Sequence, residues 1–76
     1  MDYINVHSAI LSQIGYEARN EVLEIRYVDG RVVRFLSVPP SAYIAFMNSE
    51  DKDAYFSENI ERQFAFRQVK PVMPKE

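Results

Sequence analysis

The feature that most constrains this chain is a period-two pattern on both sides of Asp29-Gly30. From Val22 to Val28, apolar and polar residues alternate, as they do in a strand that buries one face. The expected buried side chains are Leu23, Ile25 and Tyr27. Because Asp-Gly is a typical hairpin turn, residues 31–38 are expected to form the return strand. The pattern therefore predicts an antiparallel hairpin.

The register of this hairpin follows from the position of Arg34. A two-residue loop would place Arg34 opposite Ile25 on the apolar face, whereas a one-residue shift moves it to the other face. A type I turn with Gly30 in a left-handed bulge produces such a shift. We therefore predict a bulged three-residue loop, with Ile25 opposite Phe35 and Tyr27 opposite Val33. Arg26 then lies opposite Arg34.

Another strand is predicted upstream of the hairpin. Residues 8–16 alternate well enough for a strand, although Gly15 interrupts the pattern. The polar stretch that follows is expected to turn at Asn20, a residue type that tolerates left-handed backbone angles. Three sequential strands joined by short turns form a meander.

Pro39-Pro40 separates these strands from a helical region. Proline cannot donate to a strand ladder but fits the first turn of a helix. Apolar residues then recur at helical spacing, and the predicted stripe is Tyr43, Ile44, Phe46 and Met47. Ser49 or Asp51 can cap a second short helix. The predicted buried residues of that helix are Ala54, Tyr55, Phe56 and Ile60.

The predicted fold class is α+β: a three-stranded antiparallel meander packed by two short helices, with residues 64–69 as a candidate fourth strand. A chain of 76 residues has room for one core, so we expect a single domain over residues 1–70 and a disordered tail over 71–76. There are no cysteines, so hydrophobic packing must stabilise the fold. Neither a membrane span nor a signal peptide is recognisable, and we expect a cytoplasmic protein.

Residues for ordinary enzyme chemistry are scarce. His7 is the only histidine, so neither a serine hydrolase nor a histidine-rich metal site has its usual partners. The acids Glu50, Asp51 and Asp53 lack the glycine and closing glutamate of a calcium loop, and suit a helix start better. Two glycines cannot build a phosphate-binding loop. We expect no catalytic residues, no metal and no cofactor, and hence no enzyme.

The basic residues offer two readings. The net charge of −2 opposes a general attraction to nucleic acid, but four arginines can form a local basic surface. They are Arg26, Arg34, Arg62 and Arg67. In the structural reading, Glu24 or another carboxylate neutralises the pair on the hairpin. In the functional reading, the four bind an anion such as RNA, with Tyr55, Phe64 or Phe66 as stacking surfaces. Most of these aromatics are expected in the core.

Short motifs in a fixed order resemble the KTSC domain, which occurs at the C-terminus of some lysyl-tRNA synthetases and as a stand-alone bacterial or phage protein. The resemblance covers residues 6–69, about five-sixths of the chain. The matching residues are Ser8, Ile14-Gly15-Tyr16, Leu23-Glu24-Ile25, Asp29-Gly30-Arg31-Val32, Val38-Pro39, Tyr43, Tyr55-Phe56 and Asn59-Ile60. The family's central Tyr-x-Tyr is Val33-Arg34-Phe35 here, so both phenolic hydroxyls are absent.

The resemblance implies a non-enzymatic module that binds RNA, through its association with a tRNA enzyme. A different class of function stays open. The chain could be a protein-interaction or accessory module that pairs through an exposed sheet edge or apolar patch. A protein partner, rather than RNA, would then be the ligand.

Overall fold

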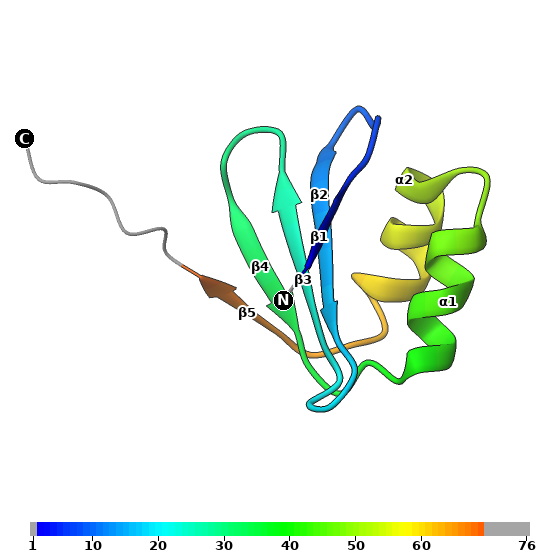
Figure 1. Ribbon diagram of the computed structural model, residues 1–76. Coiled ribbons are helices and arrows are strands. Elements are labelled where there is room, and N and C mark those ends of the chain that lie inside the picture. Colours follow the sequence, from blue (N-terminus) through cyan, green and yellow to red (C-terminus); the bar gives the residue numbers. More distant parts are fainter. Residues whose placement is uncertain (1, 70–76) are drawn as a thin grey trace, which may run out of the picture.

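The computed structural model describes residues 2–69 and contains a five-stranded antiparallel sheet in the order β1-β2-β3-β4-β5 (Figure 1). The strands are β1 (Tyr3–Asn5), β2 (Leu11–Glu17), β3 (Val22–Tyr27), β4 (Val32–Phe35) and β5 (Phe66–Val69). The α+β class and the meander are confirmed. The candidate C-terminal strand joins the sheet as β5. The sheet also contains an N-terminal strand, β1, that the sequence pattern did not predict.

The helices follow the proline pair, as predicted. Helix α1 (Pro40–Asn48) begins with Pro40 in its first turn. Helix α2 (Lys52–Tyr55) is capped by Asp51, whose side chain accepts from the backbone N–H of Ala54, and it continues directly into the π-helical turn η1 (Phe56–Ile60). These elements all cover the same face of the sheet (Figure 1). Among residues 2–69, no helix lies on the opposite face.

The core lies between that sheet face and the helices. The fully buried side chains come from every layer: Leu11, Ile14, Leu23, Ile25, Phe35, Val38, Phe46, Phe56 and Ile60. Phe56 is central, because its ring meets the edges of Phe35 and Tyr27 at centroid distances of 5.5 and 5.9 Å. Aromatic packing of this kind supplies the buried area that a small cysteine-free chain needs.

The hairpin register differs from the prediction by two residues. The loop is a three-residue one with Gly30 at φ 97°, and Tyr27 and Arg31 close it through a 2.9 Å backbone hydrogen bond. Ile25 nevertheless lies opposite Val33, not Phe35, and Arg34 lies opposite Glu24, not Arg26. The prediction had the correct loop length and faces, but the wrong partners. A two-residue slip leaves every side chain on its face, so alternation cannot detect it.

Several local predictions are also corrected. β2 begins at Leu11 instead of Ser8, because the Ser8 hydroxyl accepts from the backbone N–H groups of Ile10 and Leu11 and holds a turn there. The left-handed residue of the β2–β3 turn is Glu21, at φ 56°, instead of Asn20. In the helices, Ile44 is 55% exposed and Ala54 is exposed as well. Short helices bury a narrower stripe than their apolar residues suggested.

No helix among residues 2–69 is long and apolar enough to cross a membrane. The tail expected at 71–76 lies outside the described residues.

Candidate anion-binding face of the sheet

The sheet surface that no helix covers, here called the open face, carries a row of polar side chains from all five strands. Side chains on this face are Tyr3, Asn5, Gln13, Glu17, Val22, Glu24, Arg26, Val32, Arg34, Arg67 and Val69. They share the face because cross-strand partners in an antiparallel sheet point the same way, and so do residues two apart along a strand. Three of the four sequence-predicted arginines are thus brought together.

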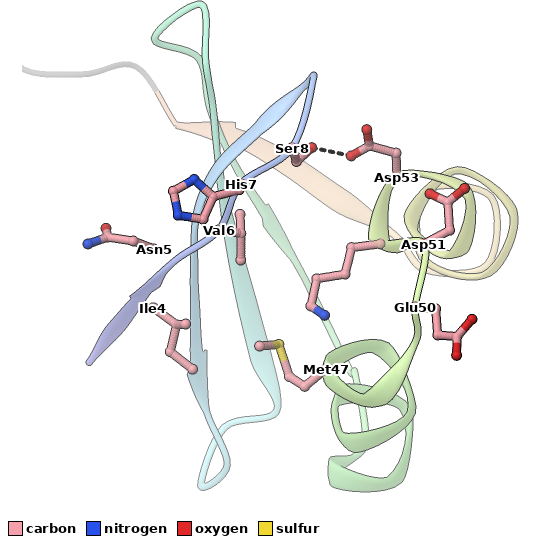
Figure 2. Close-up of a pocket in the computed structure, with 10 residues that line it drawn as sticks. Ile4, Asn5, Val6, His7, Ser8, Met47, Glu50, Asp51 and Asp53 are labelled. Carbon is pink, nitrogen blue, oxygen red and sulfur yellow. Dashed lines mark hydrogen bonds between the residues drawn. The ribbon is translucent and has the colours of Figure 1, made fainter.

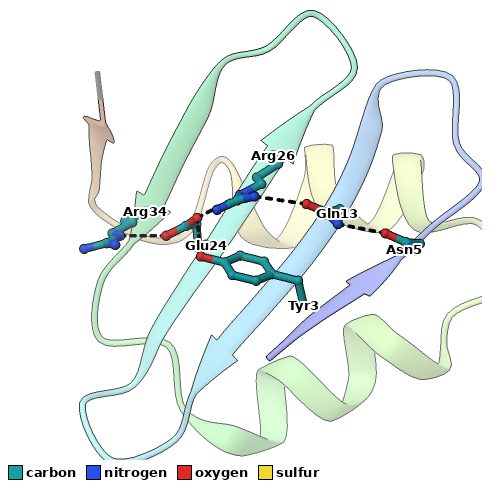
Figure 3. Close-up of polar contacts among 6 residues, drawn as sticks. All are labelled: Tyr3, Asn5, Gln13, Glu24, Arg26 and Arg34. Carbon is teal, nitrogen blue, oxygen red and sulfur yellow. Dashed lines mark hydrogen bonds and ion pairs between the residues drawn. The ribbon is translucent and has the colours of Figure 1, made fainter. Parts of the chain in front are cut away.

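Glu24 is the centre of this row, with only 2% of its surface exposed. Arg34 Nε donates to Glu24 Oε1 at 2.8 Å, and Arg26 Nε donates to Oε2 at 3.2 Å. Tyr3 Oη donates to the same Oε2 at 2.6 Å (Figure 3). One carboxylate therefore binds two guanidinium groups and a phenol. A buried charge is stable only with such partners.

These contacts keep Glu24 ionised. Burial raises the pKa of Glu24, but hydrogen bonds from Tyr3, Arg34 and Arg26 outweigh burial and leave the pKa below its ordinary value. The pKa of Tyr3 is raised, first by its own burial and then by its hydrogen bond to the Glu24 carboxylate. At neutral pH the cluster therefore contains a carboxylate, a neutral phenol and two guanidinium groups.

Tyr3 reaches Glu24 across an intervening strand. Gly15 lies opposite Tyr3 on one side and opposite Glu24 on the other, so the three form one cross-strand row. Because Gly15 has no side chain, the phenol can extend over β2. The Tyr3 ring also lies 4.1 Å from the Arg26 guanidinium carbon, in a cation–π contact.

Gln13 orients Arg26 from the side opposite to Glu24. Arg26 Nη1 donates to the Gln13 amide oxygen at 3.2 Å, and the Gln13 amide nitrogen donates to Asn5 at 2.8 Å (Figure 3). Arg26 is thus held by its Nε, by one terminal nitrogen and by the Tyr3 ring. The guanidinium keeps a defined orientation although its side chain is 43% exposed.

Arg34 and Arg67 lie directly opposite each other on β4 and β5. Glu24 contacts Arg34 only through Nε, and the Arg34 side chain stays 48% exposed. Arg67 makes no ion pair with any other residue of the range 2–69. The open face therefore holds three arginines against two acids, Glu24 and Glu17, and Glu17 borders the depression beside Arg34 and Arg67. One positive charge is left over.

The remaining sequence-predicted site residues do not join this face. Arg62 follows η1 and belongs to no strand. Tyr55 stacks on Phe46 at 5.8 Å and Phe64 packs against the core. Phe66 is 60% exposed, but it pairs with Phe35 and so shares the face of the sheet that the helices cover. The aromatic side chain actually on the open face is Tyr3.

A separate cavity of about 580 Å³ lies between the N-terminal segment and α2 (Figure 2). Ser8 donates a hydrogen bond to Asp53 there, while its oxygen accepts the two backbone hydrogen bonds described above. The His7 ring is exposed and points away from this pair (Figure 2). The Ser8 hydroxyl thus joins β2 to α2. Within residues 2–69, no three histidine or carboxylate side chains are grouped to hold a metal.

Sequence reasoning missed the burial of Glu24 and the roles of Tyr3, Gln13 and Asn5. β1 is only three residues long, too short for alternation to reveal it. Without β1, nothing in the sequence places a phenol above Glu24. A usable signal was Gly15 within a strand pattern, because such a glycine often marks a close approach by another group.

Comparisons with known proteins agree with this architecture. The KTSC domain family model matches residues 7–64. The crystal structure of a KTSC domain protein from Yersinia pestis superimposes with a TM-score of 0.84 at 30% identity, covering 91% of this chain and 97% of that one. A Stutzerimonas stutzeri protein, described as uncharacterized, is 24% identical over 58 residues, which is 76% of this chain and 82% of that protein.

Proposed function

The chain belongs to the KTSC domain family, and from that premise we propose that it is a non-enzymatic module whose open face binds RNA. The observation that carries the proposal is the convergence of Arg26, Arg34 and Arg67 on the open face of the sheet. Guanidinium groups are suited to phosphate because they donate in a fixed planar fork.

The geometry around Glu24 supports the binding of a ligand by the arginines over their mere neutralisation by this carboxylate. Its carboxylate takes the Nε of Arg26 and of Arg34, and the terminal nitrogens of Arg34 make no hydrogen bond with other residues in the range 2–69. The Arg34 side chain is 48% exposed. A buried carboxylate thus fixes Arg34 while its terminal nitrogens stay available, which lowers the entropy lost when a ligand binds.

A non-catalytic role is supported by the occupation of the chemically active groups. The Ser8 hydroxyl is bound to Asp53 and to the backbone, and Glu24 is bound by three donors. Ser8 does pair with a carboxylate, but its oxygen also accepts two backbone N–H groups, which hold the hydroxyl as a structural link between the start of β2 and α2.

The proposal is tested by titrating the isotope-labelled protein with a short single-stranded RNA at low and moderate salt. We expect amide shifts in β3, β4 and β5 that are largest at low salt, because phosphate contacts release counterions. Arg34→Gln should weaken binding, whereas Arg62→Gln, a matched arginine away from the open face, should not. An absence of shifts at low salt, or equal loss in both variants, would refute the proposal.

A protein partner is a second candidate because of the β5 edge. β5 ends the sheet within the described residues, and Phe66 exposes 60% of its surface there. An unpaired strand edge next to an exposed aromatic side chain is a common place for another chain to add a strand. Light scattering over a range of concentrations tests the simplest version, self-association. A monomer mass at every concentration would exclude self-association.

A further inference from the structure

On the open face, β4 and β5 present two cross-strand pairs of different chemistry. Arg34 lies opposite Arg67, and Val32 lies opposite Val69. The pairs are two residues apart along each strand, a separation of about 7 Å. Both valines are half-buried, so they form an apolar strip beside the charged pair. A cationic spot and an apolar strip thus lie next to each other.

The arginine pair is electrostatically unfavourable without an anion. Like charges directly opposite on neighbouring strands have Cβ atoms about 5 Å apart and destabilise the sheet. Glu24 offsets the charge of Arg34 through one Nε contact, but Arg67 receives no such contact from the part of the chain that the structure describes. Glu17 borders the same depression without forming an ion pair within that part. An anion between the two guanidinium groups would relieve the repulsion.

The surface is hollowed on both sides of Arg34. A depression of about 520 Å³ includes Tyr3, Gln13, Arg26, Val32 and Val69, and another of about 430 Å³ includes Glu17, Val22 and Arg67. Arg34 borders both. Their volumes fall within the range of sites that hold small organic ligands, roughly 300–1,000 Å³. Room therefore exists for a group on either side of the Arg34 side chain.

We infer that this part of the open face holds one nucleotide unit, with its phosphate between Arg34 and Arg67 and its base on the Val32–Val69 strip. The flat base covers the apolar strip on one side and is flanked by the Arg26 guanidinium, which is itself stacked on Tyr3. Arginine planes and apolar side chains both accept bases without requiring one base identity. The inference rests on the proposed function and specifies its binding unit, which is the same in a free mononucleotide and in an RNA strand.

The test is an amide-shift titration with uridine monophosphate, compared with inorganic phosphate and with uridine at matched ionic strength. Uridine monophosphate should shift amides of Val32 to Leu36 and of Phe66 to Val69. Phosphate should shift mainly Arg34 and Arg67, and should bind more weakly than the nucleotide. Uridine alone should bind weakest, because it lacks the charged contact.

Variants separate the two halves of the site. Arg67→Gln should weaken the binding of both uridine monophosphate and phosphate about tenfold, because one charge-assisted contact is lost. Arg62→Gln should leave both affinities unchanged. Val32→Asn should weaken the binding of the nucleotide but not that of phosphate. Glu17→Gln should tighten both, since it removes a negative charge beside the phosphate. Dispersed amide spectra of each variant establish that it is folded.

Three results would overturn the inference. They are an absence of shifts with uridine monophosphate, a nucleotide that binds no better than phosphate, and equal losses of affinity in Arg67→Gln and Arg62→Gln.

A parallel titration with short RNA separates this inference from the proposed function. If RNA binds but the mononucleotide does not, the single-nucleotide site is refuted and the proposed function is not. Binding of the mononucleotide without RNA supports the site and refutes the RNA proposal.

Discussion

At the scale of single residues, Glu24 determines the chemistry of the open face. Its carboxylate is buried, yet three donors hold it in the charged form and lower its pKa. Each donor comes from a different strand: Tyr3 from β1, Arg26 from β3 itself and Arg34 from β4. One residue therefore links the N-terminal strand to the central hairpin and sets the orientation of two arginines.

Glu24→Gln should lower the free energy of unfolding by about 2 kcal/mol at pH 7, because charge-assisted hydrogen bonds of a buried group are lost. The folded pKa of Glu24 lies below its unfolded value, so its stabilisation is complete above the unfolded pKa and disappears as the pH falls through the folded pKa. The difference between wild type and variant should thus shrink in acid.

Urea unfolding at a series of pH values from 7 downward measures this difference. Glu58→Gln is the matched control, because Glu58 is exposed and forms no ion pair within residues 2–69. A Glu24→Gln variant as stable as the control at pH 7 would show that the buried contacts contribute nothing net.

At the scale of elements, the β3–β4 hairpin depends on the backbone of Gly30. Its φ of 97° is a conformation that side chains with a Cβ rarely adopt, although no atom lies within 4 Å of where a Cβ would be. The constraint is therefore conformational and not steric contact with neighbours. Because the loop length sets the register, Gly30 also sets Glu24 opposite Arg34.

Gly30→Ala should cost about 1 kcal/mol of unfolding free energy, from backbone strain alone. Thermal or urea unfolding measures the loss. Gly30→Asn should cost less, since asparagine is better tolerated at positive φ. An alanine variant equal to wild type would mean that the loop relaxes to another turn without loss.

The elements also show what can be predicted from sequence. Alternation and the proline pair located the hairpin and α1, because each acts through local chemistry. Of the two predicted caps for the second helix, Ser49 and Asp51, the structure uses Asp51. The partners across the hairpin were off by two residues, because both registers bury the same side chains. Three arginines were placed on the correct face, but the contact with Glu24 depends on the register and on β1, which local patterns do not encode.

At the scale of the whole molecule, the proposed function depends on the asymmetry of the sheet. Helices cover one face and enclose the core against it, so the other face is available for polar chemistry (Figure 1). The overall charge of −2 does not prevent this, since charge is distributed unevenly: the helical segment from Glu50 to Glu61 is acidic, whereas the open face has an arginine excess. Local surface chemistry, not net charge, is what a ligand meets.

The most direct test of an arginine-based RNA surface is the salt dependence of affinity for a short single-stranded RNA. Phosphate contacts by Arg34 and Arg67 predict a slope of log affinity against log salt of about −1.4, and Arg67→Gln should reduce its magnitude by about 0.7. Arg62→Gln should leave the slope unchanged. The account would be contradicted by an affinity that does not change with salt concentration. It would also be contradicted if Arg62→Gln reduced the slope and Arg67→Gln left it unchanged.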